Sequence, residues 1–362
     1  MQKNELKHNS TANSGRNVGV DMLRIIMMMG IVTLHYVGHG GLLDYASAEG
    51  GNYPLLWLFR SLACMSVNCF VLITGYFQSK GTFKLHKLMV LIVQIIFWSL
   101  VTYGIAVAAG STAFSAKDLI KAAFPFFFEG YWFTTVYVVL YALSPFINKG
   151  LSALNQKQHA ILAVVMTLIF TFPFLNGVLG VESGYGLLWF VTIYVIGAYL
   201  RKYGVPRFGT AILCIVMYAV CVVLLWMPKI INIPGMSIVE LFVGGYSSIP
   251  NLLAAVSCFI LFSHINLPKI LVKLIGFISP LTLGVYLVHD SEFFRGTLWM
   301  WVNTLVAPSF STVHVWIVPL VVIAVFFAAA LADFARLGIF KLLHIERLML
   351  FISKKVIKNT ED

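Results

Sequence analysis

The fold is decided by residues 17–39, NVGVDMLRIIMMMGIVTLHYVGH, an apolar stretch long enough to cross a bilayer as one helix. Asp21 and Arg24 lie one helical turn apart near its start, and His35 lies near its end. Arg24 and His35 are eleven positions apart, close to three helical turns, so both side chains fall on nearly the same helix face. Their axial separation is about 16 Å, roughly half the hydrocarbon thickness of a bilayer. We expect this helix to present a guanidinium toward one side of the membrane and an imidazole toward the other.

These ionisable residues allow two interpretations. Charge inside a membrane helix is costly and is by default a sign of function. Alternatively, Arg24 reaches the interface with its long side chain or pairs with Asp21, and His35 is an interfacial histidine without a chemical role. The stretch by itself is compatible with both interpretations.

The composition identifies the whole chain as a helical membrane protein that crosses the bilayer several times. Of the 362 residues, 60% are hydrophobic and only 11% are charged, against about 25% in soluble domains. Apolar runs of about twenty residues predict membrane helices rather than the strands of a barrel. The net charge of +11 arises in short loops between apolar runs, which is typical of membrane orientation and argues against a nucleic-acid partner.

The cysteines indicate neither a disulfide framework nor a metal centre. All five lie inside apolar runs, and they form no CxxC pair and no cysteine–histidine ligand cluster. We interpret them as buried thiols and predict no metal site and no permanently bound cofactor. About sixteen polar and basic residues precede the first span, so we also expect no cleavable signal peptide.

Ten membrane spans are predicted from the apolar runs. A further apolar segment, 118–128, contains Pro125 and is too short to cross, so we expect it to be interfacial or re-entrant. The spans lie at about 18–37, 54–77, 86–109, 131–148, 158–178, 184–201, 208–227, 245–266, 276–294 and 312–336.

The distribution of basic residues orients these spans. Lysine and arginine gather in alternate loops, while the other loops are acidic or mixed, so the positive-inside rule places both termini in the cytoplasm. The expected architecture is an all-α bundle in the inner or cytoplasmic cell membrane. It divides into a cytoplasmic tail at 1–16, a transmembrane domain at 17–336, and a basic amphipathic helix and tail at 337–362 on the cytoplasmic face.

Several polar residues fall at a similar depth near the outer surface in this orientation. Each also has a structural interpretation. Arg60 can belong to a buried ion pair, Glu129 can be a solvated loop acid, and Trp132 can be an interface anchor. His289 and Asp290 can cap the end of a span. These outer residues are His35, Arg60, Glu129, Trp132, His289 and Asp290.

Four stretches resemble the acyltransferase-3 family of integral membrane acyltransferases, which includes bacterial enzymes that O-acetylate surface polysaccharides. Two positions depart from the family pattern: Thr74 replaces a common serine, and Tyr131 stands where many members have a histidine. The resemblance runs from about residue 17 to 335. The stretches are DMLRIIMMMGIVTLHY (21–36), VNCFVLITGYF (67–77), GYWFTTVYVVLYALSPFIN (130–148) and ISPLTLGVYLVHD (278–290).

The resemblance implies an O-acyltransferase. Its donor would be cytosolic acetyl-CoA, acting as a co-substrate, and its acceptor a hydroxyl of a cell-surface polysaccharide or lipid-linked glycan. The expected partners are therefore an acyl-CoA, a glycan and membrane lipid, and the chain can form an oligomer.

Within that reaction we expect His35 to be the catalytic group. It would act as general base on the acceptor hydroxyl or carry the acyl group as a nucleophile. Arg24 would orient the donor, Arg60 would stabilise an oxyanion, and Glu129 would orient His35. The candidate substrate-binding residues are Asp21, Trp132, Tyr286, His289 and Asp290.

Two other functions fit the same residues. A secondary transporter of a small anionic or sugar-like solute would use the charged residues along its transport path. The two halves of the sequence show no matching pair of broken segments, which argues against this function. A non-catalytic sensor or assembly partner in envelope synthesis would tolerate replacement of His35 but not of the outer loops.

Overall fold

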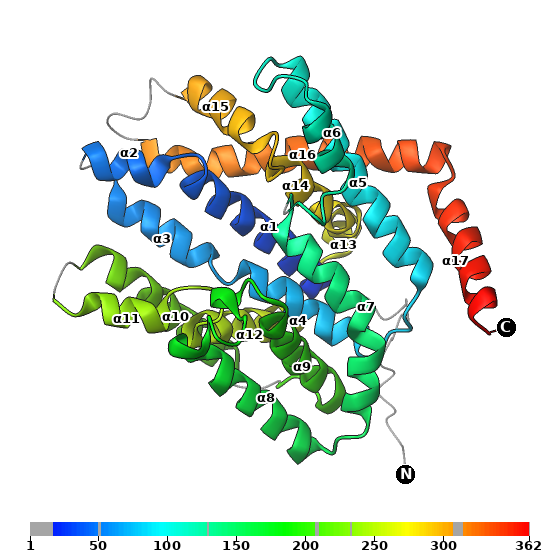
Figure 1. Ribbon diagram of the computed structural model, residues 1–362. Coiled ribbons are helices and arrows are strands. Elements are labelled where there is room, and N and C mark those ends of the chain that lie inside the picture. Colours follow the sequence, from blue (N-terminus) through cyan, green and yellow to red (C-terminus); the bar gives the residue numbers. More distant parts are fainter. Residues whose placement is uncertain are drawn as a thin grey trace, which may run out of the picture.

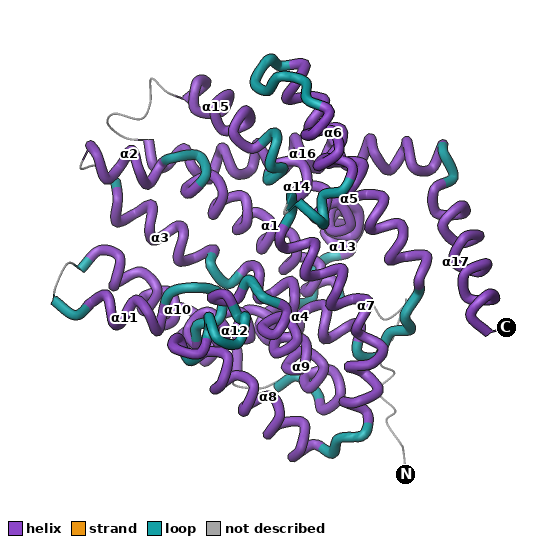
Figure 2. Tube along the Cα trace, in the orientation of Figure 1, coloured by secondary structure: helices purple, strands orange, loops and turns teal. Residues whose placement is uncertain are grey.

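The computed structural model describes residues 17–49, 52–128, 130–206, 210–231, 234–306 and 314–361. Every regular element within these ranges is a helix (Figure 2). The α-helices are α1 (Val18–Gly38), α2 (Leu42–Glu49), α3 (Tyr53–Ala63), α4 (Ser66–Gln78), α5 (Leu85–Ala108), α6 (Ala116–Ala123), α7 (Trp132–Ser152), α8 (Gln156–Thr171), α9 (Leu187–Tyr203), α10 (Thr210–Ile230), α11 (Met236–Val243), α12 (Ile249–Ser263), α13 (Lys269–Ile278), α14 (Thr282–His289), α15 (Arg295–Val306), α16 (Ile317–Leu342) and α17 (Ile345–Glu361).

Helix α1 lies at the centre of the bundle, as Figure 1 shows, and packs against α3, α4, α12, α14 and α16. Its start is fixed by Asn17, whose side-chain oxygen accepts a hydrogen bond from the Val20 amide at 3.1 Å. The Asn17 amide also donates to the Ser263 carbonyl at 2.8 Å. One residue thus caps α1 and joins it to the end of α12. We refer below to the two ends of the bundle as the Arg24 end and the His35 end.

Six helical stretches of the described residues are long and apolar enough to cross a membrane: Val18–Gly38, Tyr53–Gln78, Leu85–Ala108, Ala211–Ile230, Lys269–His289 and Ile317–Leu342. The predicted all-helical membrane fold is confirmed to this extent. The count of ten spans and the cytoplasmic placement of the termini stay predictions. Three short helices, α2, α11 and α15, lie where the sequence predicted only loops.

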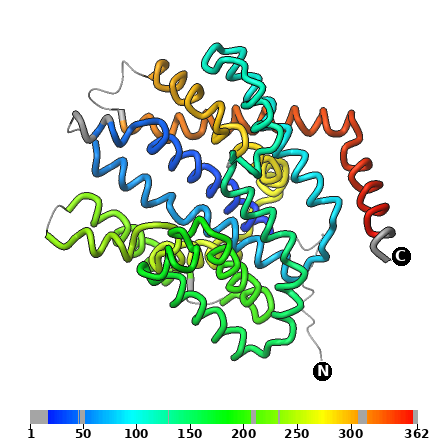
Figure 3. The backbone as a smooth tube through the Cα atoms, viewed as in Figure 1, coloured from blue at the N-terminus to red at the C-terminus, as the bar shows by residue number. Residues whose placement is uncertain are grey.

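Two of these stretches are interrupted. Tyr53–Gln78 is divided into α3 and α4 at Cys64 and Met65, and a 3₁₀ turn at Ser279–Leu281 separates α13 from α14. At the chain end α16 continues to Leu342, past the predicted boundary at 336. The separate helix α17 lies at one edge of the bundle (Figure 3).

A buried ion pair on α16 fixes the position of α14. Asp333 is fully buried, and Arg336 on the same helix donates to it twice, at 2.9 and 2.6 Å. The Trp98 indole on α5 donates to the same carboxylate at 2.8 Å. Gly284 of α14 lies directly against Asp333, so closely that a Cβ there would overlap the carboxylate. Helices α5, α14 and α16 therefore meet at one carboxylate.

Candidate functional site

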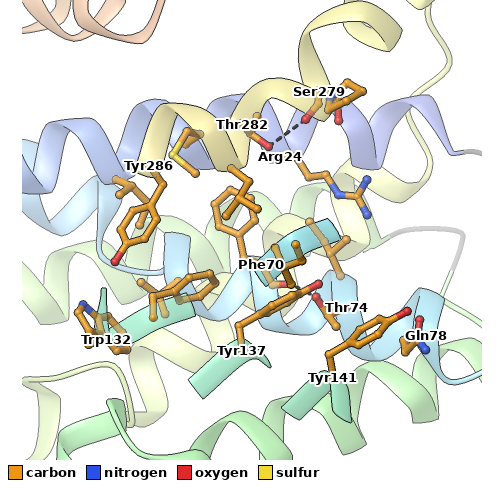
Figure 4. Close-up of a pocket in the computed structure, with 18 of the residues that line it drawn as sticks. Arg24, Phe70, Thr74, Gln78, Trp132, Tyr137, Tyr141, Ser279, Thr282 and Tyr286 are labelled. Atoms are coloured by element: carbon orange, nitrogen blue, oxygen red, sulfur yellow. Dashed lines mark hydrogen bonds between the residues drawn. The ribbon is translucent and has the colours of Figure 1, made fainter. Parts of the chain in front are cut away.

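A central cavity of about 450 Å³ extends along α1. Arg24 lines one end of it and His35 lines the other, so the two residues that share a helix face also share a cavity. Residues of α4, α5, α7 and α14 complete its lining. In Figure 4, Arg24 lies at the end of the cavity opposite Tyr286 and Trp132, and Tyr137 and Tyr141 line the α7 side. A volume of this size is typical of small-molecule sites.

The Arg24 end of the cavity is basic and polar. The Arg24 Nη1 is 3.1 Å from the Asp21 carboxylate, and the Ser279 hydroxyl donates to that same carboxylate at 3.1 Å. Asp21 is buried and stands behind Arg24, outside the lining of the cavity. The guanidinium lies 5.5 Å from the centre of the Phe77 ring, and Lys87 lines the cavity near it. Asp21 thus contacts the arginine from outside the lining of the cavity, and its predicted role in substrate binding stays a prediction.

The His35 end contains a pair of histidines whose hydrogen bonds define their tautomers. The Nδ1 of His289 is 2.6 Å from the Val285 carbonyl, which can only accept, so this nitrogen carries the proton in a neutral imidazole. The Nε2 of His289 is then an acceptor, and it lies 2.9 Å from the Nδ1 of His35. His35 must donate from Nδ1. Its Nε2 therefore keeps the lone pair that a general base or a nucleophile needs.

A buried carboxylate lies beside the same imidazole. The Asp290 Oδ1 is 3.5 Å from His35 Nδ1, 4.0 Å from His39 Nε2 and 3.8 Å from Arg295 Nη1. Asp290 is only 5% exposed, so its charge acts on the histidines with little screening by water. A carboxylate at this position favours a positive charge on His35, as a buried aspartate does beside the histidine of a catalytic triad.

Replacing Asp290 with asparagine is therefore expected to lower the rate of acyl transfer about 10- to 100-fold, because a partner of a charged group is worth about 1.5–3 kcal/mol. Transfer is measured in membranes that contain equal amounts of the variant and the wild-type protein. Glu292→Gln is the matched control, since Glu292 is an exposed carboxylate two residues further on. An Asp290→Asn protein with wild-type rates would show that the carboxylate has no part in the reaction.

The other predicted site residues are placed differently. Trp132 and Tyr286 line the central cavity, where the Trp132 ring lies 4.4 Å from that of Tyr185. Arg60 does not line it. Its guanidinium lies over Trp57 at 5.4 Å and lines a separate cavity of about 140 Å³, which is adjacent through Tyr246. Glu129 lies outside the described residues.

One group in the described residues has the composition of a metal site. His35, His39 and Asp290 each offer a ligand atom, and these atoms lie within 4.8 Å of one another. The shortest contact of the His35 Nδ1 is nevertheless its 2.9 Å hydrogen bond to His289. The observed hydrogen bonds and ion pairs therefore fit an imidazole–carboxylate network.

A protein-family model covers most of the chain. The model of the acyltransferase-3 family, described as an acyltransferase domain, matches residues 17–333. The chain belongs to this family. No curated protein and no solved structure matches the chain. This member of the acyltransferase-3 family is thus a multi-pass membrane protein and a transferase of acyl groups, and its central cavity is the candidate active site.

Part of the lining of this acyltransferase cavity was not predicted from the sequence. Phe133, Tyr137 and Tyr141 recur every four residues along α7 and line the cavity together. Their spacing places them on one helix face, so the period was visible in the sequence. Ser279 was missed because its contact with Asp21 joins residues 258 positions apart.

Proposed function

We propose that this membrane acyltransferase moves an acetyl group from cytosolic acetyl-CoA to a hydroxyl of a surface polysaccharide or lipid-linked glycan. The observation that carries the proposal is the central cavity, lined by a cation at one end and by an imidazole with an unprotonated Nε2 at the other. In the predicted orientation Arg24 is nearer the cytoplasm and His35 nearer the outer surface of the cell membrane.

The axial distance between Arg24 and His35 matches the length of the donor's pantetheine arm. The pantetheine arm of CoA has about 13 bonds between its sulfur and the first phosphorus, equivalent to a little over four residues, or about 15 Å when extended. Arg24 and His35 are about 16 Å apart along α1. A donor with its pyrophosphate at Arg24 therefore has its thioester beside His35.

His35 then performs the transfer in one of two ways. As general base, its Nε2 takes the proton of the acceptor hydroxyl while that oxygen attacks the thioester carbonyl. The C–S bond breaks, and CoA leaves as a thiolate that recovers the proton. As nucleophile, the Nε2 attacks the carbonyl itself and expels CoA as a thiolate. The acceptor hydroxyl then takes the acetyl group from Nε2, and its proton passes to the thiolate. Asp290 and His289 support the same tautomer in both routes.

Acetyl transfer is tested in two steps. First, the mass of the surface glycan is compared between cells with and without the gene, and loss of the gene is expected to remove one acetyl mass per modified sugar. Second, purified protein in vesicles is given acetyl-CoA and the glycan. Release of free CoA that requires the acceptor supports acyl transfer, whereas movement of solute without CoA release would establish the transporter alternative.

A further inference from the structure

A second cavity opens beside the Arg24 end of the central cavity. Its volume is about 380 Å³, and we call it the Arg201 cavity. It is formed where the start of α1, the end of α4 and the end of α9 meet the loop between α12 and α13. Polar residues from three of these segments line it, namely Asn17, Arg201, Ser263 and Asn266.

Arg201 has unused hydrogen-bonding capacity in this cavity. Its Nε is buried and has no hydrogen-bond partner, and its Nη1 makes one long contact of 3.4 Å to the Tyr76 hydroxyl. The guanidinium lies 5.0 Å from the centre of the Tyr76 ring. Within the described parts of the chain no carboxylate forms an ion pair with it. A buried donor without an acceptor is costly, so this arginine is arranged for an anion that the protein does not supply.

The two cavities share the last turn of α4. Thr74 and Gln78 line the central cavity, whereas Tyr76 and Phe77 line the Arg201 cavity. The Arg24 guanidinium lies over the Phe77 ring, 5.5 Å from its centre. Phe77 therefore lies between the Arg24 end of the central cavity and the Arg201 cavity, and an elongated ligand that occupied both would pass beside this ring.

Phosphate is the anion that fits this arrangement best. Arginine presents several N–H donors in one plane, which match the oxygens of a phosphate. The donor of the proposed function places its pyrophosphate at Arg24, so its adenosine 3′-phosphate lies beyond Arg24, on the side of the Arg201 cavity. The aromatic rings of Tyr76 and Phe77 in that cavity offer surfaces on which a base can stack.

We propose that the Arg201 cavity binds the nucleotide end of an acyl-CoA donor and that Arg201 binds its 3′-phosphate. This inference rests on the donor assigned under the proposed function. It adds a second binding site to the molecule: the central cavity holds the acyl-pantetheine arm, and the Arg201 cavity holds the nucleotide.

The test is a comparison of two ligands that differ by one phosphate. CoA and 3′-dephospho-CoA are titrated into the purified full chain in nanodiscs, and their Kd values are measured by calorimetry. Wild-type protein is expected to bind CoA about tenfold more tightly, because a charge-assisted contact is lost in dephospho-CoA. In Arg201→Gln the two Kd values are expected to agree within about twofold, whereas Lys157→Gln, which removes an exposed lysine elsewhere, should keep the wild-type ratio.

Acetyl-pantetheine controls for folding, because it lacks the nucleotide and should bind Arg201→Gln as it binds the wild-type protein. Arg201→Lys, which keeps the charge, should retain part of the preference for CoA and serves if the glutamine variant does not fold. An unchanged CoA preference in Arg201→Gln, or equal binding of both nucleotides by wild-type protein, would overturn the inference while leaving the proposed function intact. Absence of CoA binding to wild-type protein would instead overturn the donor assignment and the inference together.

Discussion

His35→Ala is expected to lower acyl transfer by about 10²- to 10⁴-fold, the contribution of a positioned acid–base group. The substitution removes the Nε2 lone pair that the hydrogen bonds through His289 and Val285 leave available. The measurement is incorporation of labelled acetyl groups into the glycan by vesicles that contain equal amounts of protein. The effect should appear in the rate at saturating donor, because the proposed binding mode places the donor's phosphates at the other end of the cavity.

His39→Ala is the control for this substitution. His39 is four residues further along, is 47% exposed in its side chain and reaches Asp290 only at 4.0 Å. Its removal should change the rate by less than about threefold, as for a surface ion pair. If His35→Ala inserted normally and retained wild-type transfer, His35 would have no catalytic role, and the reaction would depend on another group in the cavity.

Gly284→Ala is expected to destabilise the protein by about 3 kcal/mol or more, the upper range for overpacking a filled interior. The added Cβ would overlap the Asp333 carboxylate, which cannot move aside because Arg336 and Trp98 both hold it. Since α14 also carries Tyr286 and His289, acyl transfer should fall together with stability. The midpoint of thermal unfolding of the purified protein measures the effect.

Gly104→Ala is the matched control, because Gly104 lies inside α5 and a Cβ there would meet no atom within 4 Å. Alanine is favoured over glycine in a helix by about 1 kcal/mol, so this variant should be as stable as the wild type or more stable. Equal unfolding midpoints for Gly284→Ala and the wild type would show that α14 and α16 can separate without cost.

The features that were predicted correctly are those that depend on local sequence patterns. The assignment to helical membrane proteins followed from long apolar runs, and the common helix face of Arg24 and His35 followed from their separation of eleven positions. Both are properties of a single helix. Relations within one helix do not depend on how the other helices pack, so the sequence alone is sufficient for them.

Contacts between residues on different helices could not be predicted from the sequence. The bond between His35 and His289 spans 254 positions and depends on where α14 packs, which no local pattern encodes. Arg60 was predicted at a suitable depth, yet α3 turns it toward Lys229 and Glu240 and away from the central cavity. Depth in the membrane is a single coordinate, and the direction of a side chain around its helix axis is a second one that depends on tertiary packing.

The carboxylate at which α5, α14 and α16 meet has a consequence for biogenesis. Asp333 and Arg336 lie on the last long apolar helix, while their partners on α5 and α14 are synthesised earlier. An unpaired charge in lipid costs about 3 kcal/mol. We therefore expect α16 to leave the translocon with Asp333 and Arg336 paired, next to α5 and α14, which are already in the membrane. The helix that carries His289 is therefore expected to reach its final position only after α16 has been inserted, so the candidate site is incomplete until then.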